Sequence, residues 1–247
     1  METSIEKYLT EAEAVELAAH GAALEYLNNL QAFAERALPE SVLSEKCSAL
    51  LQYRVPAMSA DGCSRIDGTM DDAPYDLRPT LGLPDRSVES HPAVCRLAQI
   101  DSLVEKVAAE AGIDWLGVYL AWKSCDGSDA LVKLAYRGAE SRAEFPLTRE
   151  FARQSNNSTV GLSGKAVVIN DIEQYLWDQG GPYYQCDSKV LSEACLPIFK
   201  PGGDGILGIV DAEAWSRGTF SPEVISKLTA FCVVLESALD NLVAELK

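Results

Sequence analysis

Two stretches of the sequence combine side chains that could carry redox or acid–base chemistry. The first, residues 183–198, contains Cys186 in a polar segment and Glu193 seven residues later, where an apolar strand begins. The second contains Asp211 and Glu213 in an otherwise apolar strand, and a spacing of two directs both side chains to one face of a sheet. Carboxylates in a core-type strand are costly to bury unless they serve a ligand, a cap or a partner. These four side chains are therefore the candidates for a catalytic site.

A thiolate beside carboxylic acids suits one kind of reaction. The sulfur of Cys186 would attack an electrophilic sulfur or selenium centre, and an acid would protonate the departing oxygen. Acidic neighbours raise the pKa of a thiol, so the thiolate needs an opposing donor or protonated acids. The carboxylates could instead hold the ammonium group of an amino acid. Two plainer interpretations stay open: Cys186 as an inert loop thiol, and Asp211 and Glu213 as surface acids on an edge strand.

Hydrophobic periodicity predicts the elements that position these residues. Four segments have apolar residues at helical spacing: 15–34, 40–52, 93–111 and the segment that follows the cap residue Ser221. Five segments have the composition of strands: 115–122, 130–137, 166–170, 191–199 and 206–212. Hairpin turns between strands imply antiparallel pairing, which predicts an α+β fold with helices on an antiparallel sheet. The polar segment 145–160 stays unassigned, and residues 161–164 are expected to turn into a short helix.

The sequence divides into three predicted parts. Residues 1–52 are expected to form an N-terminal helical extension, 53–92 an irregular connection rich in Pro, Asp and Gly, and 93–247 the α+β domain. An irregular segment as long as 53–92 is either a surface linker or a lid over a site.

Composition excludes several classes of function. The 247 residues carry 21 Lys and Arg against 37 Asp and Glu, a formal net charge of −16, so we expect neither nucleic-acid binding nor adhesion to a membrane. The seven cysteines include no CxxC pair and there are two histidines, so we expect no bound metal or other resident cofactor. With no signal-peptide pattern and no apolar run of about 18 residues, we expect a cytoplasmic protein with reduced thiols.

From about residue 93 to residue 247 the chain resembles a GAF domain and, among GAF domains, the free methionine-(R)-sulfoxide reductases. Three segments carry the resemblance: DWLGVYL at 114–120, the motif from Cys186-Asp to Ser-Glu193, and LGIVDAE at 207–213. The resemblance implies a GAF-like antiparallel sheet flanked by helices. The N-terminal extension has no counterpart in the minimal family domain.

The resemblance also implies a role for each candidate residue. Cys186 matches the family's nucleophile, which attacks the sulfoxide sulfur and becomes a sulfenic acid. Glu193, Asp211 and Glu213 match acids that bind the amino acid and assist protonation of the oxygen. The residues expected to contact the substrate are Trp115, Tyr119, Tyr184 and Asp187, of which the first two wall the pocket around the methyl-sulfinyl group.

Two cysteines that usually resolve the sulfenic acid in this family have no counterpart here. Ser163 takes the place of one, within residues 160–164, and residues 151–155 contain no cysteine for the other. Without them the usual internal disulfide cannot form. A thioredoxin-like external thiol reductant would have to act, or another cysteine such as Cys63 or Cys125, or the protein no longer turns over.

The sequence therefore leaves two functions open. One is an enzyme that reduces a small sulfoxide through a cysteine thiolate with an external reductant, and the other is a catalytically degenerate GAF module that binds or senses a small molecule. Both predict a ligand that resembles methionine sulfoxide. Because GAF domains often associate through terminal helices, the N-terminal and C-terminal helices are also expected to form a homodimer.

Overall fold

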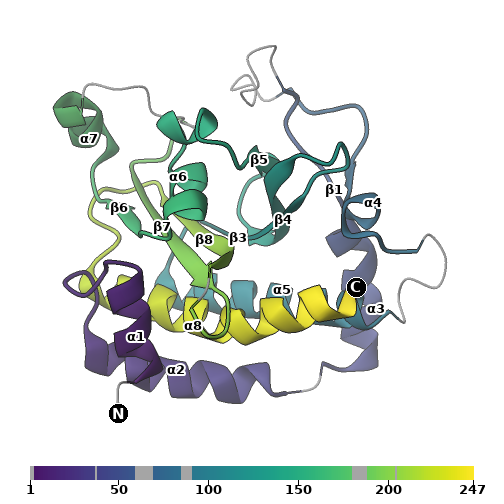
Figure 1. Cartoon of the computed structure of the whole chain (residues 1–247), viewed down its shortest axis with the longest axis horizontal. Helices are drawn as coiled ribbons and strands as arrows, with labels where there is room; N and C mark the ends of the chain where they lie inside the picture. The colour runs from purple at the N-terminus through teal and green to yellow at the C-terminus, as the bar shows by residue number, and fades with distance from the viewer. Residues whose placement is uncertain (1–2, 37, 59–68, 85–90, 180–187, 204) are drawn as a thin grey trace.

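The computed structural model describes most of the chain: residues 3–36, 38–58, 69–84, 91–179, 188–203 and 205–247. Figure 1 shows a curled sheet with helices beneath it and short helices above it. Within the described ranges, no helix is both long and apolar enough to cross a membrane.

A six-stranded sheet lies at the centre of the fold, with the strand order β5-β4-β3-β8-β7-β6. All neighbouring strands pair antiparallel. The strands are β3 (Trp115–Lys123), β4 (Asp129–Arg137), β5 (Glu144–Pro146), β6 (Val167–Ile169), β7 (Ser192–Phe199) and β8 (Ile206–Ala214). The α+β class with an antiparallel sheet is thus confirmed, and the five predicted strands agree with the observed ones to within two residues at each end.

Helices cover one face of this sheet in two layers. α5 (Pro92–Ala111) and α8 (Pro222–Glu245) pack directly on the strands, and α2 (His20–Ala34) packs against α8. Figure 1 shows α2 on the side of α8 that faces away from the sheet. The apolar stripes of α5 and α8 meet strand side chains such as Leu116 and Val118, which are fully buried in the main core.

The N-terminal extension departs from its predicted helix. α1 (Ser4–Glu11) comes first, and the helix predicted over 15–34 begins only at residue 20, as α2. Between the two, the chain turns and the carbonyl oxygen of Ala12 accepts a hydrogen bond from the backbone N–H of Ala166, just before β6. This contact joins residues far apart in the chain, which local periodicity does not encode, and it lies just before the residues where helix was expected.

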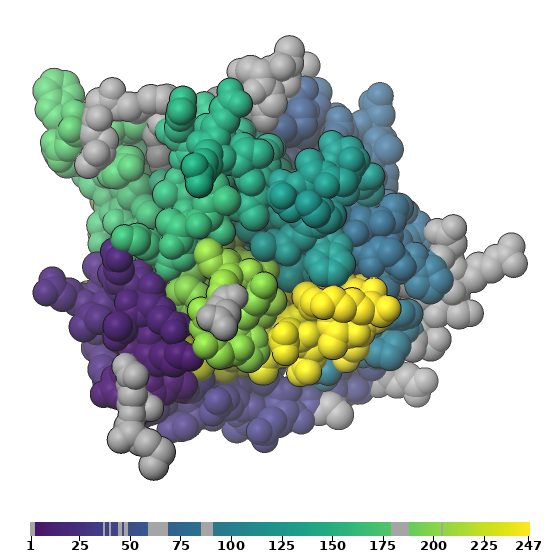
Figure 2. All heavy atoms as spheres, in the orientation of Figure 1, coloured from purple at the N-terminus to yellow at the C-terminus, as the bar shows by residue number. Residues whose placement is uncertain are grey.

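The extension packs onto the body of the molecule. Figure 2 shows the N-terminal segment (purple) against the turn of the β7–β8 hairpin (yellow-green), beside the C-terminal helix (yellow). The Tyr8 hydroxyl donates a hydrogen bond to the carbonyl oxygen of Pro197 (2.8 Å), and the Tyr8 ring meets Phe199 edge to face. Within the chain α2 and α8 pack against each other, and the homodimer through these helices stays a prediction.

The segment 53–92, predicted to be irregular, contains short regular pieces. The elements here and just before are α3 (Glu40–Leu51), β1 (Gln52–Tyr53), β2 (Tyr75–Asp76) and α4 (Leu77–Leu81). β1 and β2 pair antiparallel. The Tyr53 hydroxyl donates a hydrogen bond to the carbonyl oxygen of Lys133 (2.9 Å), which ties this segment to β4. The three-part domain division stays a prediction.

The polar segment that the sequence left unassigned also has regular structure. In and just after this segment lie the 3₁₀ turn η2 (Phe151–Arg153) and α6 (Asn156–Ser163). Farther along the chain, after β6, comes α7 (Ile172–Gln179). Ser155 caps α6 by accepting a hydrogen bond from the backbone N–H of Ser158, and Gly164 ends it with φ at 70°. The turn predicted to lead into a helix at 161–164 is therefore wrong, because those residues end a helix instead.

Candidate functional site

Five of the predicted site residues lie on the face of the sheet that α5 and α8 do not cover. We call this the open face, although its residues are largely buried. In the strand register Glu213 lies opposite Trp115 and also opposite Glu193 on its other side. Asp211 is two positions from Glu213 on β8, and Tyr119 is four positions from Trp115 on β3, so their side chains share this face. Antiparallel pairing of β3, β8 and β7 therefore brings together residues that are up to 98 positions apart, from Trp115 to Glu213.

Two of the acids, Glu193 and Asp211, are buried on this face, and we call this pair the acid floor. Glu193 is 6 % exposed and Asp211 is 3 % exposed. Burial, and then the charge of Asp211, raise the pKa of Glu193 to about 8. Burial likewise raises the pKa of Asp211 to about 7, although a hydrogen bond from Asn157 opposes the shift. Near neutral pH this pair therefore holds protons that ordinary surface carboxylates have lost.

Helix α6 supplies amide donors to both acids. The side-chain amide of Asn156 donates to Oε1 of Glu193 (3.1 Å), and that of Asn157 donates to Oδ2 of Asp211 (2.9 Å). Ser163, which was expected in a cysteine's place, lies exposed at the other end of α6, where its Oγ accepts from the backbone N–H of Lys165. The residues of α6 that meet the acids are thus the two asparagines.

Sequence reasoning missed Asn156 and Asn157. The signal that could have found them is Ser155, a good N-cap residue, directly before two asparagines. The first turn of a helix that follows such a cap presents short polar side chains to whatever lies beside its N-terminus.

Two buried oxygen atoms at this floor have no hydrogen-bond partner among the described residues. They are Oδ1 of Asp211 and Oδ1 of Asn157. A buried polar atom without a partner costs about 1–3 kcal/mol, so such atoms mark positions where a ligand or water is expected to bind. When Asp211 is ionised both atoms are acceptors, so the group that would satisfy them is a hydrogen-bond donor, and a primary ammonium offers three N–H bonds.

Aromatic rings line the face beside the acids. Trp115 stacks near Tyr136 (ring centroids 6.2 Å apart) and lies tilted against Tyr119 (6.4 Å), and Tyr119 meets Phe145 edge to face. The Trp115 indole N–H donates to the carbonyl oxygen of Ala139 (3.0 Å), which holds the ring in place. These rings provide an apolar wall suited to a small thioether or sulfoxide group.

Gly117 makes room for the Trp115 ring. A Cβ at this position would lie 2.3 Å from an atom of the indole. We expect Gly117→Ala to displace the ring, lower the free energy of unfolding by about 1–3 kcal/mol and weaken ligand binding. Urea unfolding and near-ultraviolet circular dichroism measure both changes. Gly21→Ala is the control, because a Cβ there meets nothing within 4 Å; equal stability of the two variants would contradict the steric argument.

The remaining candidates are placed as follows. Glu213 is half-buried at the edge of the acid floor. Cys186, Asp187 and Tyr184 lie outside the described residues, and so does Cys63. Within the described ranges, no group of three or more His, Cys, Asp and Glu side chains could hold a metal ion.

Two other cysteines are described near or along the same sheet. Cys195 is fully buried and lies directly opposite Asp211, in the cluster of the open face rather than in the core under the helices. Cys125 is exposed in the turn between β3 and β4, beside Thr80. At about 3.3 Å per strand residue, the eight positions from Gly117 put Cys125 on the order of 25 Å from the acids.

Comparisons with known proteins support the fold. No protein-family model and no curated protein sequence matches the chain. Among solved structures, the type II free methionine-R-sulfoxide reductase from Thermoplasma acidophilum matches at 18 % identity with a TM-score of 0.50, over 61 % of this chain and 96 % of that one. The free methionine-R-sulfoxide reductase from Neisseria meningitidis, in complex with its substrate, matches at 20 % identity with a TM-score of 0.46, over 59 % of this chain and 80 % of that one.

A GAF domain from an Acinetobacter phosphoenolpyruvate-protein phosphotransferase also matches, at 15 % identity with a TM-score of 0.45, over 59 % of this chain and 82 % of that one. At these identities the likeness concerns the fold alone. The chain therefore has a GAF-like α+β fold, similar to that of the free methionine-R-sulfoxide reductases, with an N-terminal helical extension.

Proposed function

We propose that the chain binds a small amino acid sulfoxide on the open face of its sheet and reduces it, with free methionine-(R)-sulfoxide as the substrate. The observation that carries this proposal is the pair of buried acids, Glu193 and Asp211, with an unpartnered carboxylate oxygen beside an aromatic wall. The acids suit an ammonium group and the supply of a proton, and the rings suit the methyl-sulfinyl end.

In the proposed reaction the Cys186 thiolate attacks the sulfoxide sulfur. A protonated acid of the pair, Glu193 or Asp211, donates a proton to the sulfoxide oxygen, because their raised pKa values keep a proton available near pH 7. The sulfur–oxygen bond of the substrate breaks as the oxygen passes to Cys186, which leaves a thioether and a sulfenic acid. Two electrons pass from the cysteine to the substrate.

The enzyme must then be reduced again from outside. An external dithiol of the thioredoxin type would attack the sulfenic acid, release its oxygen as water and leave as a disulfide, which restores the Cys186 thiol. An external thiol is supported by α6, which presents asparagines rather than cysteines to the acids.

The test is direct turnover. We expect the full chain to convert methionine-(R)-sulfoxide to methionine with dithiothreitol or a thioredoxin system, and Cys186→Ser to abolish the product. Cys125→Ser is the matched control, because that thiol is exposed at the far turn of the sheet, and it should retain activity. Absence of methionine with both reductants would contradict the proposed reaction.

A second candidate function is a binding module that has lost turnover. The observation that favours it is the same pair of asparagines on α6, which donates to one oxygen of each acid without offering a second thiol. Calorimetric titration of the wild-type chain with methionine sulfoxide, beside the turnover assay, separates the two functions. Binding by a wild-type protein that releases no methionine would establish the module, and turnover would exclude it.

A further inference from the structure

A groove lies between the N-terminal extension and the GAF-like body, apart from the acid floor. Its cavity has a volume of about 570 Å³. One side comes from α3, with Val42 and Leu50, and the other from the end of β4, with Leu134 and Ala135. This volume lies within the usual range for small-molecule sites, about 300–1,000 Å³, which are mostly apolar with a few charged groups.

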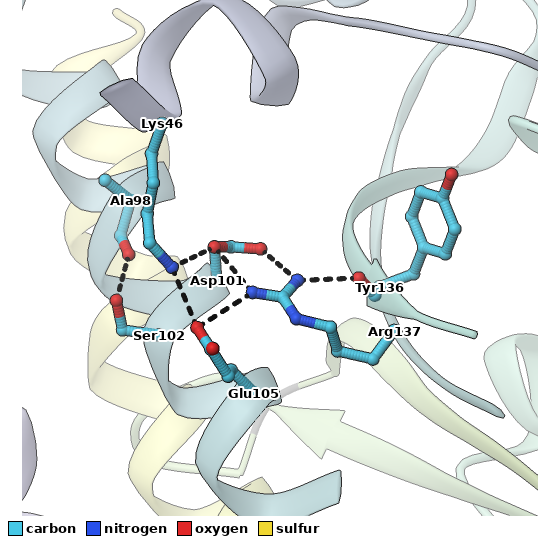
Figure 3. A network of polar contacts seen from close by, with 7 residues as sticks. All are labelled: Lys46, Ala98, Asp101, Ser102, Glu105, Tyr136 and Arg137. Carbon is cyan, nitrogen blue, oxygen red and sulfur yellow. Dashed lines mark hydrogen bonds and ion pairs between the residues drawn. The ribbon is translucent and has the colours of Figure 1, made fainter. Parts of the chain in front are cut away.

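Four charged side chains meet at one wall of the groove (Figure 3). Figure 3 shows Lys46 from α3 and Arg137 from β4 approaching two acids of α5, Asp101 and Glu105. Lys46 Nζ donates to Asp101 Oδ2 at 2.6 Å, and Arg137 donates to both oxygens of Asp101, at 2.6 and 3.0 Å. These bonds hold the pKa of Asp101 low against its burial.

The two acids differ in how firmly they are held. The Asp101 side chain is 7 % exposed and accepts three short bonds from two cations, so removing it from this position would be costly. The Glu105 side chain is 61 % exposed, and its two bonds, from Lys46 and Arg137, are both 3.1 Å long. Exposed ion pairs of this kind contribute little to stability, so Glu105 can leave its place at small cost.

When Glu105 swings into solvent, it leaves two cations at the wall of an apolar groove. Asp101 neutralises one of the two positive charges, so one net positive charge remains there. A carboxylate in the place of Glu105 would accept charge-assisted hydrogen bonds from Lys46 and Arg137. The apolar side chains of the groove would bury the rest of the molecule.

We propose that this groove is a second ligand site, which binds a small carboxylate with a compact apolar body in place of the Glu105 side chain. The body would lie between α3 and the end of β4, so the ligand would bridge the extension and the GAF-like domain. Tyr136 lines the groove, and its ring stacks on Trp115 of the open face.

The test compares a carboxylate with its neutral amide on the wild-type chain. We expect hexanoate to bind by calorimetric titration with a Kd on the order of 1 mM, which is ordinary for so few atoms, and hexanamide to bind at least tenfold more weakly. Equal affinity for the two, or no binding of hexanoate, would overturn the proposal. This comparison needs no substitution and so does not depend on the stability of any variant.

Variants then locate the site. Glu105→Gln should tighten hexanoate binding about threefold or more, because the neutral amide competes less well for the two cations than the carboxylate does. Lys46→Met should weaken hexanoate binding at least fivefold, because it removes one of these cations. Glu110→Gln is the matched control, since this acid lies on the same helix but pairs with Lys106 outside the groove. Asp211→Asn should also leave the Kd for hexanoate unchanged. A changed Kd in this variant would show that hexanoate binds at the acid floor and would overturn the proposal.

Discussion

Asp211→Asn is expected to make the protein more stable at pH 8 and to abolish its binding of methionine sulfoxide. Burial raises the pKa of Asp211 to about 7, so at pH 8 the native state must hold an ionised carboxylate away from water. The neutral amide removes this cost, and we expect the free energy of unfolding to rise by about 1–4 kcal/mol. The side-chain amide of Asn157 could still meet the new carboxamide oxygen, so the local geometry need not change.

The same substitution removes the charge that the proposed ligand would meet. Loss of one partner of a buried ion pair costs about 2–5 kcal/mol, which corresponds to a loss of affinity of about 30-fold to several thousand-fold. Urea unfolding at pH 8 and calorimetric titration with methionine sulfoxide measure the two effects. Asp129→Asn is the matched control, because that acid lies on β4 of the same sheet but is 63 % exposed. A variant that is less stable yet binds normally would contradict both expectations.

The free energy of unfolding is expected to fall as pH rises from about 5 to about 8. The folded-state pKa values of Glu193 and Asp211, about 8 and about 7, lie above their ordinary values of 4.5 and 3.8. In this window the native state therefore keeps protons that the unfolded chain has released, so stability decreases with pH by up to about 1.4 kcal/mol per unit for each proton kept. About one unit above the higher of the two pKa values, near pH 9, both states are ionised and the dependence from this pair ends.

Urea unfolding at pH 5, 6, 7 and 8 tests this dependence, with Asp211→Asn and Glu193→Gln expected to flatten the curve. Glu236 on α8 contributes in the same direction, because burial raises its pKa to about 7, so Glu236→Gln is needed to measure its share. Asp101 acts oppositely, since its cations lower its pKa, but its effect appears only below about pH 4. Stability that is constant or rises between pH 5 and pH 8 would contradict the burial of the acid pair.

Much of the sheet could be predicted from the sequence because its signals are local. Alternation of apolar residues and the hairpin turns located five of the six strands of the main sheet to within two residues but missed β5. The spacing of two between Asp211 and Glu213 placed both on one face. Helix α6 could not be predicted in this way. Its residues lack a clear apolar stripe, and its position depends on Ser155 and on contacts with strands far away in sequence.

The sequence by itself determined the two-residue alternation of side chains along the strands and the cap of α8 at Ser221, because these depend on neighbours a few positions apart. It also supplied the residue types at the candidate site. Only the tertiary structure decided which residues meet. The bond between Asn157 and Asp211 spans 54 positions, and the Lys46–Asp101 bond that fastens the extension to the body spans 55. Such pairs form when packing selects one register and one docking position, and their energy depends on burial, which no local pattern specifies.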